Sequence, residues 1–167
     1  EPQIAFRNLQ FGALGSETMI SARSAPMLFG LSLLEAVPES AILALAQQQR
    51  GTSISGKPNY VWDAEAGKAV LGRFGWKANQ PNVRQQVAAA LLNDIGATST
   101  LFPIDNCPPA QTLCRSDPTT TDCGGVNGGC TGNLLAEVLP SRLRALTLYV
   151  QSLLIPPRPV TLTAQQQ

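Results

Sequence analysis

Histidine is absent from this chain of 167 residues. A chain without histidine supplies no Ser–His–Asp or Cys–His catalytic group, no imidazole metal ligand and no CxxCH attachment motif for haem. Charged residues are also scarce at 14%, and 12 basic against 11 acidic side chains leave a net charge of +1. This near balance argues against a nucleic-acid partner and against a polybasic membrane-surface protein.

Long apolar runs are missing too, since no stretch of 18 or more apolar residues occurs and no transmembrane helix is expected. The longest apolar stretch, 27–37, is interrupted by Gly30, Ser32 and Glu35. Neither a signal peptide nor an initiator methionine is present, so we expect a mature secreted protein or a piece of a longer one.

Apolar residues recur at helical spacing in several segments, whereas no segment has the alternation typical of a sheet. The spacing predicts helices over 26–37, 38–51, 81–94 and 134–154, with Pro140 kinking or restarting the last. The residues expected to face inward from the second helix are Ala41, Ile42, Leu45 and Ala46. The predicted fold class is therefore mainly α, with three to four helices and long irregular loops. We expect one domain over 1–156 and a linker or tail over 157–167.

Four cysteines lie in the Pro- and Gly-rich segment 97–133. Cys107 and Cys114 are seven positions apart, as are Cys123 and Cys130. An even count in such a segment favours disulfides and an oxidising compartment, and short loops favour the two local pairings. Six residues between cysteines is too many for zinc knuckles, so no metal site is expected. Free or redox-active thiols are the remaining alternative, although no CxxC motif is present.

Segment 51–82 is rich in Gly, Pro and Asn but also holds both tryptophans, Trp62 and Trp76. Its string Arg73-Phe74-Gly75-Trp76-Lys77 places two cations around two aromatic rings. An acidic or planar ligand would suit such a cluster, through arginine contacts or stacking. The alternatives are that the aromatic rings cover the core, or form cation–π contacts on the surface.

Glu35 lies among apolar neighbours near the end of the first predicted helix. A carboxyl group in such surroundings is a candidate general acid or base. The alternative is a helix-terminal glutamate that reaches solvent or caps a backbone group.

Three strings together resemble one family: SAPMLFGLSLLEAVPE at 24–39, ISGKPN at 54–59 and GRFGWKA at 72–78. They are similar to the bacterial di-haem c-type oxidoreductases, which are distantly similar to di-haem cytochrome c peroxidase. The resemblance spans roughly residues 10–156. Family members carry two CxxCH motifs flanking a region like this one, so the chain resembles the cytochrome-c-like enzyme segment between the two haems.

The resemblance implies roles for individual residues. Trp76 would be an electron-transfer relay between haems, and Glu35 would be the distal-pocket acid. The residues implied to bind the cofactor are Arg23, Arg73, Lys77 and Phe74. Haem c would reach the protein only through flanking segments or a partner chain, and this chain alone would be inactive.

We therefore expect part or a subunit of a periplasmic or secreted di-haem oxidoreductase, which shapes the haem pocket and the path between the haems. Its partners would be haem-bearing segments or a haem-bearing subunit. A larger assembly that contains them is a further expectation. One alternative is a haem-free structural or binding subunit of a larger secreted or membrane-associated assembly. Another is a thiol–disulfide oxidoreductase that uses its cysteines.

Overall fold

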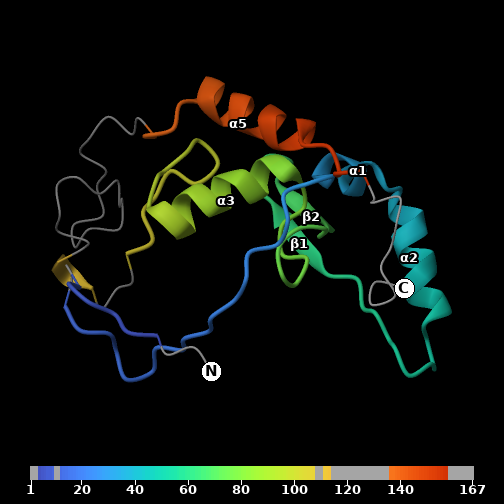
Figure 1. Cartoon of the computed structure of the whole chain (residues 1–167), viewed down its shortest axis with the longest axis horizontal. Coiled ribbons are helices and arrows are strands. Elements are labelled where there is room, and N and C mark those ends of the chain that lie inside the picture. Colours follow the sequence, from blue (N-terminus) through green and yellow to red (C-terminus); the bar gives the residue numbers. More distant parts are fainter. Residues whose placement is uncertain (1–3, 10–11, 108–110, 114–135, 158–167) are drawn as a thin grey trace.

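The computed structural model describes residues 4–9, 12–107, 111–113 and 136–157. Its elements are α1 (Leu31–Ala36), α2 (Glu39–Gln48), β1 (Tyr60–Asp63), β2 (Lys68–Leu71), α3 (Val83–Ile95) and α5 (Pro140–Ser152). Helix α5 lies along α3, and the β1–β2 hairpin lies at one end of α3 near α1 (Figure 1). The mainly helical class predicted from the sequence is confirmed.

Helix α3 has the clearest local signals. The side chain of Asn82 caps its first turn by accepting a hydrogen bond from the Gln85 N–H at 2.8 Å. Gly96 ends the helix with a φ of 73°, a left-handed conformation that glycine adopts at little cost. The predicted helix over 81–94 is therefore observed, displaced by one or two residues.

Helix α5 begins at Pro140, which occupies its first turn. A proline fits there because its missing N–H would have no partner within the helix. Of the two expectations for Pro140, the helix start is the one observed. Residues 136–139 precede the helix without helical structure, and Val138 forms an isolated bridge with Ser99.

The core is small and centres on α3. Its buried apolar side chains are Leu71, Phe74, Val83, Ala88, Ala89, Leu92 and Leu143. Leu143 of α5 is fully buried, as is Val83 at the start of α3, so these two helices supply the central contact. Burying a leucine of this kind stabilises a fold by roughly 1.5–3 kcal/mol.

A two-stranded antiparallel sheet corrects the expectation that the chain has no strands. Strand β1 pairs with β2 so that Trp62 lies opposite Ala69 and Asp63 opposite Lys68. The Asp63 carboxylate accepts the N–H groups of Glu65 and Ala66, both at 2.9 Å, and so closes the connecting turn. Each strand has four residues, which is too short for alternation to stand out in the sequence.

Helix α2 corrects a second expectation. It begins after Pro38, as predicted, but none of its residues is buried. The inward face expected from Ala41, Ile42, Leu45 and Ala46 therefore covers no core, and Leu45 is 56% exposed. In Figure 1 this helix lies at the end of the molecule beyond α1.

The segment before α1 is extended rather than helical. The first helix was expected from residue 26, yet α1 begins only at Leu31, after Gly30 with a φ of 70°. The Gly30 N–H donates to the Leu153 carbonyl oxygen at 2.9 Å, and a Cβ at Gly30 would lie 2.6 Å from Ile155. The chain therefore passes closely against the end of α5 at this point, in a left-handed conformation that favours glycine.

The disulfide prediction falls mainly outside the described residues. Cys107 is disulfide-bonded. Cys114, Cys123 and Cys130 lie outside the described part of the chain, so the pairing of the four cysteines stays a prediction. No helix among the described residues is long and apolar enough to cross a membrane.

Candidate functional site

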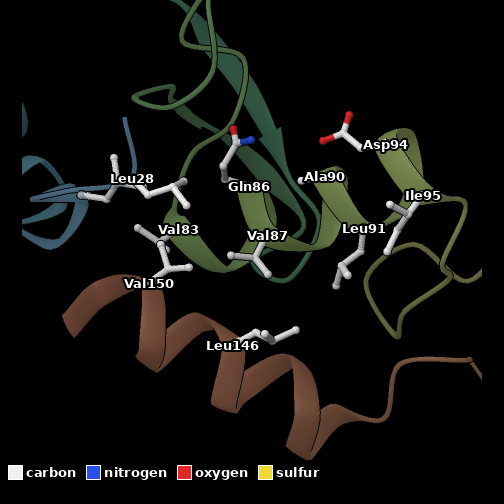
Figure 2. A pocket seen from close by; sticks show the side chains of 11 residues that line it. Leu28, Val83, Gln86, Val87, Ala90, Leu91, Asp94, Ile95, Leu146 and Val150 are labelled. Carbon is white, nitrogen blue, oxygen red and sulfur yellow. The ribbon is translucent and has the colours of Figure 1, made fainter. Parts of the chain in front are cut away.

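Two hollows lie on opposite sides of α3, and each is named after helices or a residue that line it. The α3–α5 groove has a volume of about 320 Å³ and is lined by aliphatic side chains of both helices and of the segment before α1. Figure 2 shows Leu28, Val87, Leu91, Leu146 and Val150 around this groove.

The Trp76 hollow has a volume of about 390 Å³ and is lined mainly by polar side chains. Its residues come from the loop before α3, from α3 itself and from the extended N-terminal segment. They include Trp76, Lys77 and Arg23. Three of the residues predicted from the sequence to bind a cofactor or carry electrons therefore line one hollow.

Gln86, Ala90 and Asp94 line both hollows. They are four positions apart, so they form one ridge along α3. In Figure 2 the polar ends of Gln86 and Asp94 point away from α5, so the groove is apolar although these residues border it.

Trp76 is 59% exposed. Its ring therefore does not cover the core, which answers one of the alternatives left open by the sequence. Gly75 precedes it with a φ of 82°, and a Cβ there would lie 2.1 Å from Asn79 Oδ1. The tight turn that presents Trp76 thus depends on a glycine.

Phe74 corrects one prediction. Its side chain is 3% exposed, and its backbone forms an isolated bridge with Gln80. The ring therefore belongs to the core and offers no surface to a cofactor, in contrast to Trp76 two residues further on.

Glu35 is held by two hydrogen bonds that join three helices. Its Oε1 accepts the Val83 N–H at 2.9 Å, and its Oε2 accepts the Gln151 side-chain N–H at 2.6 Å. A carboxylate at the first turn of α3 satisfies a helix N–H and interacts favourably with the positive end of the helix dipole. The capping alternative for Glu35 is therefore the one observed.

Arg73 caps the C-terminal end of a helix, whereas Glu35 caps an N-terminal end. Its Nη1 donates to the Val37 carbonyl oxygen at 2.6 Å and to the Leu34 carbonyl oxygen at 3.2 Å. These carbonyl groups belong to the end of α1, where a cation is favourable. Neither Glu35 nor Arg73 is among the residues that line the Trp76 hollow.

Gln85 and Gln86 are two features that the sequence analysis missed. Gln85 is 5% exposed and joins α3 to the hairpin, because its side chain accepts from the Ala64 N–H at 2.8 Å and donates to the Trp62 carbonyl oxygen at 3.0 Å. Gln86 Oε1 is buried without a hydrogen-bond partner in the described part of the chain. Their positions within an amphipathic helix gave no signal of either role.

Comparison with protein-family models places the chain in a class of redox proteins. Residues 6–165 match the family described as "Di-haem oxidoreductase, putative peroxidase". The chain therefore belongs to this family, in agreement with the resemblance drawn from its sequence. No curated protein and no solved structure matches the chain.

The residues of this chain do not fit a haem attachment site. The chain has no histidine. The sulfur atoms available in the described residues are those of Met19 and Met27, which are 96% and 78% exposed, and of the disulfide-bonded Cys107. Neither methionine lines either hollow. A c-type haem needs two thiols and an imidazole that this chain cannot supply together.

Proposed function

We propose that this chain is a part or subunit of a periplasmic di-haem c-type oxidoreductase and that its surface lies against haem-bearing segments or a haem-bearing subunit. The family match over residues 6–165 supports this role. The absence of histidine assigns the haem ligands to other segments or another chain. The chain's own task is then to shape the surroundings of the haems.

The observation that carries the proposal is an exposed apolar surface around α1, which we call the α1 apolar face. It comprises Met27, Phe29, Leu33, Leu154 and Ile155, each between 47% and 83% exposed. The hydrogen bond between Gly30 and Leu153 holds the two contributing segments together. Apolar side chains gathered on an exposed surface often mark a place that another molecule or segment covers.

Trp76 is the proposed electron-transfer residue. Its exposed ring lines a hollow beside the cations Arg23 and Lys77, which are available to carboxylate groups. The pairing of Arg73 with haem carboxylates is not favoured, because its Nη1 already donates to two backbone carbonyl groups. Glu35 accepts the Val83 N–H as a helix cap, and this contact does not support an acid role.

The periplasmic location is supported by the disulfide bond of Cys107. Structural disulfides persist in oxidising compartments and are rare in the cytosol.

Surface variants of the natural assembly test the proposal. Leu33→Lys and Leu154→Lys introduce charge into the α1 apolar face, at residues that are 62% and 83% exposed. Leu45→Lys on α2 is the matched control, because Leu45 is 56% exposed and lies outside that face. We expect the first two variants to reduce the haem absorbance that co-elutes with the tagged chain, by roughly tenfold for a 1.4 kcal/mol loss of binding energy.

Two results would contradict the proposal. One is equal haem absorbance for all three variants and the unmodified chain in an assembly whose haems lie on a separate subunit. The other is a stable assembly that contains the chain but no haem, which would favour a haem-free structural subunit.

A further inference from the structure

The Trp76 hollow has the properties of a small-molecule site in its own right. Its volume of about 390 Å³ lies within the range of ligand pockets, which is roughly 300–1,000 Å³. Trp76 is 59% exposed there, although an indole ring gains free energy when it is covered. The hollow thus combines sufficient space with an aromatic surface that no described residue covers fully.

The charges of the hollow indicate what it would bind. Arg23, Lys77 and Asp94 line it, so its side chains carry two positive charges and one negative charge. Neither cation forms an ion pair with another described residue, and Arg23 uses its Nε only to donate to Ser21 Oγ at 3.1 Å. One additional carboxylate would neutralise the hollow, whereas two would leave an excess of negative charge.

The amide groups of the hollow add both hydrogen-bond donors and acceptors, and the Gln86 Oε1 is an acceptor without a partner in the described part of the chain. Gln80 uses its Oε1 to accept from Gln85 at 3.0 Å, and Asn93 uses its Oδ1 to accept from Asn106. The nitrogen atoms of these two amides form no hydrogen bond with a described residue. These nitrogen atoms are donors available to a ligand, and donors suit a carboxylate.

We propose that the Trp76 hollow binds a small planar aromatic monocarboxylate. The ring of the ligand stacks on Trp76, and its carboxylate lies between Arg23 and Lys77. This inference goes beyond the proposed function, because it concerns a free ligand of this chain and needs no haem. The charge balance favours a ligand that carries one carboxylate.

Calorimetric titration of the 167-residue chain with 2-naphthoate tests the inference. We expect a dissociation constant of about 1 mM or tighter, and a loss of affinity of at least about fivefold in both Trp76→Ala and Lys77→Ala. Trp62→Ala and Lys68→Ala are the matched controls, since both residues are exposed on the hairpin and line neither hollow. Cyclohexanecarboxylate, which has the charge without the planar ring, should bind more weakly to the unmodified chain.

Circular dichroism melts establish that each variant is folded, so that a loss of binding reports on the site. No heat of binding with 2-naphthoate, or equal affinity in Trp76→Ala and Trp62→Ala, would overturn the inference. Binding of protoporphyrin without binding of 2-naphthoate would also overturn it. That last result would leave the proposed function standing, and so the two ideas fail separately.

Discussion

Replacement of Glu35 by alanine removes the acceptor of two hydrogen bonds at once. One comes from the backbone N–H of Val83 at the start of α3, and the other from Gln151 of α5. A hydrogen bond to a charged group contributes about 1.5–3 kcal/mol when buried. A carboxylate at a helix N-terminus gains a further 0.3–1 kcal/mol or so. Because Glu35 is only half-buried, we expect the free energy of unfolding to fall by about 2–3 kcal/mol in total.

The assay is urea unfolding followed by circular dichroism, with two comparison variants. Glu35→Gln keeps an oxygen acceptor for the Val83 N–H but loses the charge, so it should lose about half as much stability. Glu39→Ala removes an exposed carboxylate from the first turn of α2 and should cost no more than about 0.5 kcal/mol. Equal unfolding midpoints for Glu35→Ala, Glu39→Ala and the unmodified chain would refute the capping role.

Three further outcomes follow from the structure. Gly72→Ala should destabilise the fold by at least about 1 kcal/mol more than Gly15→Ala in urea unfolding. A Cβ at Gly72 would lie 1.9 Å from the backbone carbonyl oxygen of Ala78, whereas the nearest atom at Gly15 is 3.8 Å away, so equal losses would contradict this close approach. Gln86→Met should leave the melting temperature unchanged or raise it, because it removes a buried acceptor without a partner, whereas a clear loss would reveal an unrecognised contact. Thiol titration of the denatured, unreduced protein should find no free thiol, and a reactive Cys107 would contradict its disulfide.

Local signals allowed part of the fold to be predicted from the sequence. Helix α3 has an apolar stripe, an Asn82 cap and Gly96 at its end, and all three act within a few residues of one another. Pro140 similarly marked the start of α5, although its sequence context also permitted a kink. Such elements are predictable because their determinants are contiguous in the chain.

The remaining features depend on contacts between distant segments. The partners of Glu35 are 48 and 116 positions away, so no local pattern could distinguish a helix cap from an acid catalyst. The apolar stripe of α2 predicted burial, yet a stripe does not show whether another segment covers it. Trp76 is exposed and Phe74 is buried although they lie two positions apart, a difference that the residue types alone did not reveal.

The proposal that this chain works beside haem is tested most directly by an absorption spectrum. The chain would be tagged in its natural host, and the intact assembly recovered under native conditions without added haem. We expect a Soret band in amounts stoichiometric with the chain, because haem must come from other segments or another chain of the same assembly. If the tagged chain is recovered folded from its natural host and the recovered material has no Soret band, the proposal is contradicted.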